Sequence, residues 1–192
     1  MSLPKAYFDA VYTANRDPWS FATSDYERAK YAATLQALPN PRYQRAFEIG
    51  CSIGVLTRQL ADRCDALLAV DASALPLADA RTRLADCPQV TIEQMQIPVD
   101  FPTGPFELIL VSEVGYYLSL PDLAEARACM VGALSPGGHL LLVHWTPVVP
   151  DYPLTGDAVH EFFLELTSSG GPLTHLHQTR ADTYRLDLFQ KR

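Results

Sequence analysis

The sequence predicts an α/β domain in which a parallel sheet carries helices on both faces. Three observations lead to this prediction. Short apolar segments of strand length alternate with helical segments from residue 41 onwards. One of them, Ala66–Val70, is almost wholly apolar, which is typical of a strand that is covered on both faces. No repeat, low-complexity tract or long linker interrupts the alternation, so the 192 residues are predicted to form a single domain.

Residues 1–40 are expected to form a helical lid, and residues 41–192 the α/β core. Two helical segments are predicted between Tyr7 and Leu38, with a break at Asp17-Pro18-Trp19. Side chains of the second segment recur at spacings of three and four, which indicates one consistent helical face. Pro39-Asn40-Pro41 ends this segment, because proline cannot continue a helix.

The core is predicted to begin with a strand at Ala46–Ile49 and a helix that starts at about Val55. The next strands are expected at Ala66–Val70, Val90–Met95, Phe106–Val111 and His139–Trp145, and the helices between them at Ala74–Ala85 and Leu123–Leu134. Pro136-Gly137-Gly138 is expected to turn the chain into the strand that ends at Trp145. A helix at Asp157–Thr167 and two extended segments, His175–Thr179 and Thr183–Gln190, complete the chain.

The composition favours a small molecule as the binding partner. Fifteen basic and 22 acidic side chains give a net charge of −7, and no basic stripe is present to pair with a phosphate backbone, so nucleic acid is not expected. No segment approaches the ~18 apolar residues of a membrane span, and no leader is recognisable, so we expect a cytoplasmic protein. The four cysteines lie far apart, which indicates free thiols and no metal site.

The chemistry is expected at the loop that follows the first strand, Glu48-Ile49-Gly50-Cys51-Ser52-Ile53-Gly54. Ligands of an open parallel sheet bind beyond the carboxyl ends of its strands. Gly50 and Gly54 allow a tight turn, and the amides that start the next helix favour a negative group. Asp71 ends the second strand about 20 residues later, where a carboxylate can accept both hydroxyls of a ribose.

Several interpretations of this loop compete. A dinucleotide-binding loop needs three glycines, but Ser52 and Val55 replace the second and the third. A serine hydrolase would use Ser52 with downstream partners such as Asp157 and His160, although no oxyanion loop precedes the serine. The pattern acid-x-Gly-x-small-x-Gly, with an acid that ends the second strand, is typical of S-adenosylmethionine binding and fits at every position. A non-catalytic module that only binds this cofactor, and a glycine-rich turn without a ligand, also remain open.

Short stretches with particular sequences are spread over the chain to about Trp145: Asp17-Pro18-Trp19, Tyr26-Glu27, Lys30-Tyr31, Glu48-Ile49-Gly50-Cys51, Glu113-Val114, Tyr116-Tyr117-Leu118 and Pro136-Gly137-Gly138-His139-Leu140. In these stretches the chain resembles the class I S-adenosylmethionine-dependent methyltransferases and, more narrowly, the nodulation protein S family, N-methyltransferases of chitin-oligosaccharide signals. The resemblance implies a doubly wound, Rossmann-like sheet of seven mostly parallel strands, with the last strand, Thr183–Gln190, antiparallel.

The resemblance also implies S-adenosyl-L-methionine as the cofactor and assigns residues to it. The cofactor-binding residues that it predicts are Glu48, Gly50, Cys51 and Gly54 around the glycine loop, Asp71 and Ala72 at the ribose, Met95, Gln96 and Ile97 at the adenine, and Ser112. Relatives usually have an aspartate where this chain has Gln96. An amide both donates and accepts, so Gln96 can still bond the adenine amino group.

Residues at the same edge of the sheet are predicted to serve the methyl acceptor. Glu113, after the fourth strand, is expected to hold an amine of the substrate or the ammonium of the cofactor. His144, at the end of the fifth strand, is the candidate base, with a structural role as the alternative. Tyr116, Tyr117 and Trp19 are predicted to contact the substrate, although each can also serve packing. The sequence thus predicts methyl transfer to an amine or hydroxyl of a small polar acceptor, such as a sugar derivative.

Overall fold

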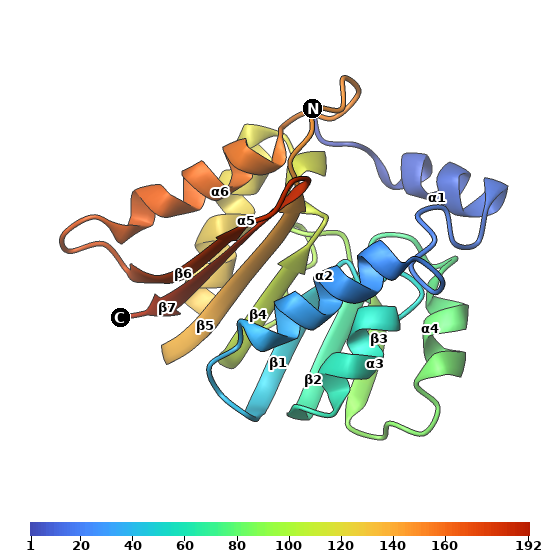
Figure 1. Cartoon of the computed structure of the whole chain (residues 1–192), viewed down its shortest axis with the longest axis horizontal. Coiled ribbons are helices and arrows are strands. Elements are labelled where there is room, and N and C mark those ends of the chain that lie inside the picture. Colours follow the sequence, from blue (N-terminus) through green and yellow to red (C-terminus); the bar gives the residue numbers. More distant parts are fainter.

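A seven-stranded sheet with the strand order β3-β2-β1-β4-β5-β7-β6 forms the centre of the computed structural model, which describes residues 1–192 (Figure 1). The strands are β1 Tyr43–Ile49, β2 Cys64–Asp71, β3 Val90–Gln94, β4 Phe106–Ser112, β5 Leu134–Trp145, β6 Leu173–Arg180 and β7 Tyr184–Lys191. Strands β1 to β5 pair in parallel, whereas β7 is antiparallel to both β5 and β6. The predicted sheet, with its antiparallel last strand, is confirmed.

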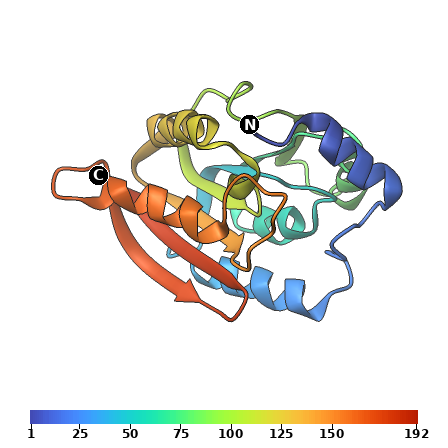
Figure 2. The same ribbon diagram turned by 90° about the horizontal axis from the view of Figure 1, so that it is seen from above.

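Helices cover both faces of this sheet; Figure 2 shows α2 and α5 on opposite sides of it. The helices are α1 Lys5–Ala14, α2 Asp25–Gln36, α3 Val55–Ala61, α4 Leu77–Arg83, α5 Leu120–Ala133 and α6 Gly156–Leu164, with single 3-10 turns η1 Gly115–Tyr117 and η2 Glu165–Thr167. No helix is long and apolar enough to cross a membrane.

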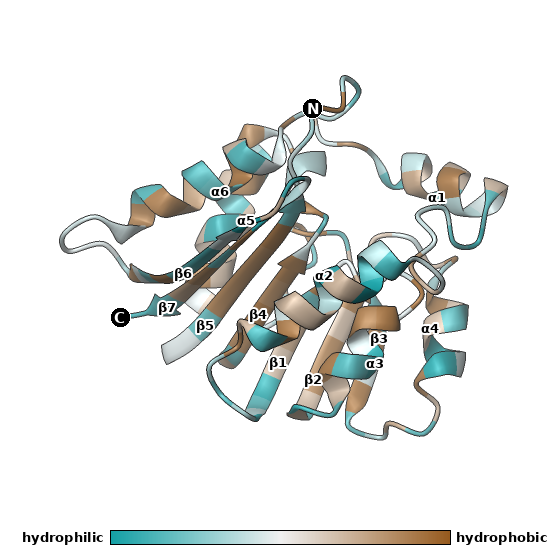
Figure 3. Ribbon diagram, in the orientation of Figure 1, coloured by the Kyte–Doolittle hydropathy of each residue, from teal (hydrophilic) through white to brown (hydrophobic).

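Alternate residues of the central strands face two separate cores, as the two-residue period of a strand requires. Leu108 and Leu141 face the side on which α2 and α3 pack. Ile109 and Leu142 face the opposite side, which is covered by α5 and α6. The central strands are therefore apolar on both faces, as their colouring in Figure 3 shows, and the carboxyl edge of the sheet remains for polar chemistry.

Two predicted boundaries are corrected by the structure. The expected turn at Pro136-Gly137-Gly138 lies inside β5, which starts at Leu134; Gly137 has a φ of +76° and the pairing with β4 shifts its register here, so the segment is an irregular part of the strand. Helix α5 begins at Leu120, ahead of the predicted Leu123, because the hydroxyl of Ser119 caps it.

Candidate functional site

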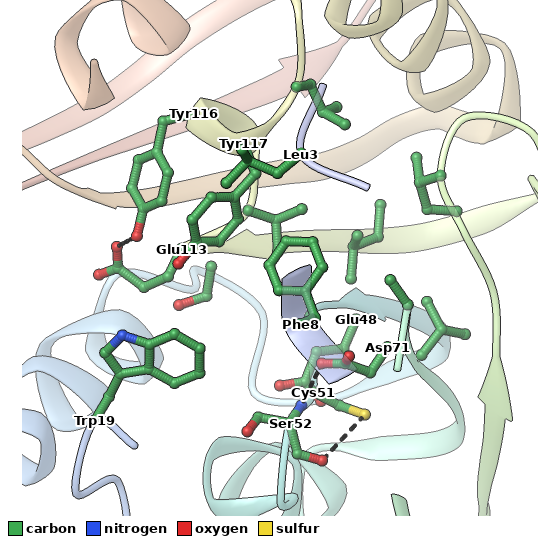
Figure 4. Close-up of a pocket in the computed structure, with 18 of the residues that line it drawn as sticks. Leu3, Phe8, Trp19, Glu48, Cys51, Ser52, Asp71, Glu113, Tyr116 and Tyr117 are labelled. Carbon is green, nitrogen blue, oxygen red and sulfur yellow. Dashed lines mark hydrogen bonds between the residues drawn. The ribbon is translucent and has the colours of Figure 1, made fainter. Parts of the chain in front are cut away.

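A cavity of about 440 Å³ lies along the carboxyl ends of β1, β2 and β4 (Figure 4). The predicted site residues that line it are Trp19, Glu48, Gly50, Cys51, Asp71, Ala72, Met95, Gln96, Ile97, Ser112, Glu113, Tyr116 and Tyr117. Gly54 and His144 are not among the lining residues. The topology explains the gathering, since parallel strands bring their carboxyl ends to one edge.

The glycine loop after β1 has the backbone shape that the sequence indicates. Gly50 has a φ of +90°, and a Cβ at this position would come within 2.3 Å of the side chain of Val114, so the loop packs closely against the segment after β4. Gly54 has a φ of +78° and is the N-cap of α3. Gly54 thus shapes the turn from outside the cavity.

Asp71 is held at the end of β2 by backbone N–H groups. Its Oδ2 accepts from the N–H of Ser52 at 3.1 Å and its Oδ1 from the N–H of Ser73 at 2.9 Å. Burial raises the pKa of Asp71 to about 6, although these hydrogen bonds counteract the shift. The carboxylate is therefore oriented before any ligand arrives.

Glu48 carries a buried carboxylate oxygen without a partner. The residue is 1% exposed, its Oε2 has no hydrogen bond, and burial raises the pKa of Glu48 to about 7. Buried polar groups are nearly always hydrogen-bonded, so each exception calls for an explanation. A ligand that brings an N–H or O–H donor into the cavity would satisfy this oxygen.

The three residues that a serine hydrolase would use do not contact one another in the structure. The Oγ of Ser52 accepts from the hydroxyl of Tyr12 at 2.7 Å, which is a contact between α1 and the glycine loop. His160 is instead hydrogen-bonded to Asp187 at 2.6 Å, inside the protein. Asp157 pairs with two arginines near the surface. The three residues therefore make separate contacts and form no triad.

Glu113 forms the centre of a charged cluster at the other end of the cavity (Figure 4). Its Oε1 contacts Nζ of Lys30 at 2.6 Å, and its Oε2 accepts from the hydroxyl of Tyr116 at 2.5 Å and from the N–H of Trp145 at 2.8 Å. Its φ of +59° is uncommon for a residue with a side chain. Several contacts thus fix the direction of this carboxylate.

Lys30 and Glu27 of α2 complete the cluster, and neither residue was predicted from the sequence to belong to a site. Nζ of Lys30 also contacts Oε1 of Glu27 at 3.0 Å. Burial alone would lower the pKa of Lys30, but the two carboxylates raise it above its usual range, so the lysine stays charged. The sequence signal for both residues was their presence in the stretches Tyr26-Glu27 and Lys30-Tyr31.

Aromatic side chains form the walls around this cluster. Tyr116 stacks on Tyr152 with ring centroids 5.1 Å apart, and Tyr117 meets Phe8 of α1 edge to face at 5.0 Å. Trp19 lines the cavity from the segment between α1 and α2. These rings pack against one another and also face the cavity, so packing and ligand contact are compatible here.

His144 does not fit its predicted role as a base for the acceptor. It is fully buried on the side of β5 that α6 covers. Its Nε2 accepts from the N–H of Gly115 at 3.0 Å, and its Nδ1 contacts Nε2 of His160 at 3.0 Å. Burial holds the pKa of His144 well below its usual range. With both ring nitrogens engaged away from the cavity, His144 supports the loop after β4.

Comparisons with known proteins point to one family. The family model described as nodulation protein S matches residues 11–144. Nodulation protein S of Rhizobium tropici is 33% identical over 141 residues, which cover 65% of this chain and 53% of that protein. The homologue from Bradyrhizobium diazoefficiens is 34% identical over 131 residues, which cover 65% of this chain and 61% of that protein. The chain thus spans little more than half the length of these curated relatives.

Solved structures agree with this result. A candidate methyltransferase from Pseudomonas syringae is 40% identical, with a TM-score of 0.75 over 86% of this chain and 99% of its own. The N-methyltransferase NodS of Bradyrhizobium japonicum, in complex with S-adenosyl-L-homocysteine, is 25% identical, with a TM-score of 0.84 over 97% of each chain.

Proposed function

The chain belongs to the nodulation protein S family, and from this premise we propose that it is an S-adenosyl-L-methionine-dependent methyltransferase acting on a small polar acceptor. One observation supports the proposal most directly: a single cavity connects Asp71 and the glycine loop with the charged cluster at Glu113. A methyltransferase needs these two neighbouring sites, because it must align a methyl donor with a nucleophile.

The residues at the Asp71 end fit the cofactor. The carboxylate of Asp71 is oriented to accept ribose hydroxyls, and the unpaired Oε2 of Glu48 offers an acceptor to an ammonium group. Gly50 and Cys51 bring the backbone to the cavity wall, while Met95, Gln96 and Ile97 would flank the adenine. When bound, the cofactor supplies an electrophilic methyl group on a sulfonium.

The residues at the Glu113 end would bind the acceptor, an amine or a hydroxyl of a sugar-like molecule. Glu113 offers a fixed carboxylate, and Tyr116, Tyr117 and Trp19 offer aromatic walls for an amphipathic ring. Residues 1–40 would act as the lid, and Leu3 in this segment donates its N–H to the carbonyl of Tyr117 at 2.9 Å, beside the cavity. The four free cysteines support a reducing compartment, such as the cytoplasm.

Turnover tests the proposal. The protein is incubated with S-adenosyl-L-methionine and a panel of amino sugars, glycosides and simple amines, and the products are analysed by mass spectrometry. We expect an acceptor of this class to gain one methyl group as S-adenosyl-L-homocysteine accumulates, and Asp71→Asn to reduce the rate. Binding without transfer to any acceptor in the panel would favour the non-catalytic module instead.

A further inference from the structure

The carboxylate of Glu27 also lines the cavity, but it has no role in the proposed binding of the cofactor. Glu27 lies on α2, lines the cavity, and has a side chain that is only 9% exposed. Its Oε1 contacts Lys30, whereas its buried Oε2 has no hydrogen-bond partner. A buried acceptor without a partner destabilises the fold, and more so when it is charged. The atom is therefore suited to a donor that arrives with a ligand.

The surrounding charges favour a cationic donor. Lys30 supplies one positive charge to two carboxylates, Glu27 and Glu113, and it contacts the Oε1 atom of each. The other titratable groups that face Glu27 are the phenols of Tyr26 and Tyr31, and phenols are neutral near pH 7. With both carboxylates ionised, the cluster keeps a net negative charge that a cationic ligand would neutralise.

The position of the cluster assigns this ligand to the acceptor side. Glu113, which shares Lys30 with Glu27, is bonded to the N–H of Trp145 at the end of β5, whereas Asp71 ends β2. Strands β1 and β4 separate these two strands in the sheet. Figure 4 shows Glu113 and Asp71 at opposite ends of the cavity. A cofactor with its ribose at Asp71 therefore leaves the Glu27 end for a second molecule.

We propose that Oε2 of Glu27 binds the reacting amine of the methyl acceptor and receives a proton from it. This inference rests on the proposed function and deepens it, because it names a residue that positions the acceptor and takes up its proton.

The carboxylate of Glu27 can also accept the proton that the amine must lose before it is methylated. An alkylamine has a pKa of about 10 and binds as an ammonium, whose nitrogen has no free electron pair. When one N–H bond breaks, the proton moves to Oε2 and the bonding electrons stay on nitrogen as the lone pair. Burial raises the pKa of Glu27, which makes it a better proton acceptor. An alcohol holds its proton far more tightly, so the same carboxylate discriminates against it.

The test compares two probes of equal shape, cyclohexylamine and cyclohexanol, which are titrated calorimetrically into protein saturated with S-adenosyl-L-homocysteine. We expect the wild type to bind the amine at least ~10-fold more tightly, and Glu27→Gln to reduce this preference below ~3-fold. Asp25→Asn is the matched control, because it removes an exposed carboxylate from the same helix, one that pairs only with Arg28. Asp25→Asn should keep the preference. Glu27→Met replaces Glu27→Gln if the latter does not fold.

The affinity for S-adenosyl-L-homocysteine, measured on the same samples, separates the outcomes. An equal preference for the amine in wild type and variant, or no preference in the wild type, would overturn the role of Glu27 while the proposed function stands. Weaker cofactor binding by Glu27→Gln with an unchanged preference would overturn it too, because Glu27 would then serve the cofactor's ammonium. Failure of the wild type to bind S-adenosyl-L-homocysteine would contradict the proposed function itself.

Discussion

Two buried charged clusters lie on either side of β5, and they differ in one respect. The cavity cluster, formed by Glu27, Lys30 and Glu113, leaves one carboxylate oxygen without a partner. The interior cluster is centred on Asp187 of β7, and both oxygens of this carboxylate are occupied. Burial alone therefore does not mark a functional site. An unsatisfied polar atom that faces a cavity does, whereas a satisfied network holds the fold.

In the interior cluster, both carboxylate oxygens of Asp187 have hydrogen-bond partners. Oδ2 of Asp187 accepts from Nδ1 of His160 and Nε of Arg185, each at 2.6 Å, and Oδ1 contacts Nε2 of His175 at 2.6 Å. His160 in turn contacts His144, whose Nε2 accepts from the N–H of Gly115. The network thus ends at the loop that carries Glu113, and it supports the cavity cluster from behind.

The largest effect is expected from breaking the interior cluster. Asp187→Asn removes the fully buried one of the three carboxylates that pair with Arg185, and with it the charged acceptor that His160 and His175 share. Breaking a buried ion pair in this way costs about 3–5 kcal/mol of unfolding free energy, which urea denaturation measures. Asp65→Asn is the control, because this carboxylate is exposed, pairs with Arg42 outside the cluster, and should cost about 1 kcal/mol or less. An equal loss of unfolding free energy in both variants would show that the interior cluster contributes no more to stability than an exposed ion pair.

A smaller effect, opposite in sign, is expected from Glu48, the other unsatisfied carboxylate of the cavity. Its pKa is about 7 in the folded protein and 4.5 in its usual state. A raised pKa stabilises the fold below the unfolded value, and this contribution is lost as the pH rises through the folded value. Relative to wild type, the unfolding free energy of cofactor-free Glu48→Gln should therefore increase by about 2 kcal/mol between pH ~5.5 and pH ~8.

The matched control for this pH series is Glu93→Gln, an exposed glutamate of β3. A Glu48→Gln curve that runs parallel to the wild-type curve over the whole range would contradict the account of Glu48 as a carboxylate that awaits a donor.

Much of the fold follows from periodicity. Each predicted strand was found, because apolar segments of strand length between turn residues leave little choice of structure. The placement of Asp71 and Glu113 at the cavity was also predictable, since parallel strands share a carboxyl edge. Boundaries that depend on caps and bulges, such as Ser119 and Gly137, were not.

The remaining part of the site depends on tertiary contacts. Lys30 and Glu113 are 83 residues apart, and no spacing in the sequence predicts their ion pair. The position of His144 away from the cavity has a different origin. His144 shares its face of β5 with Leu142, which points to the core under α6, so the two-residue period of the strand already directed it away from the cavity.

Calorimetric titration of S-adenosyl-L-homocysteine into the wild type and into Asp71→Asn tests whether this cavity binds the cofactor. We expect binding to the wild type and a loss of ~10-fold or more in the variant, about 1.4 kcal/mol, because the amide cannot accept both ribose hydroxyls. The stability of the variant should change little compared with that of Asp187→Asn. No binding to well-folded wild type, or equal affinity in both proteins, would contradict the assignment of this cavity to the cofactor.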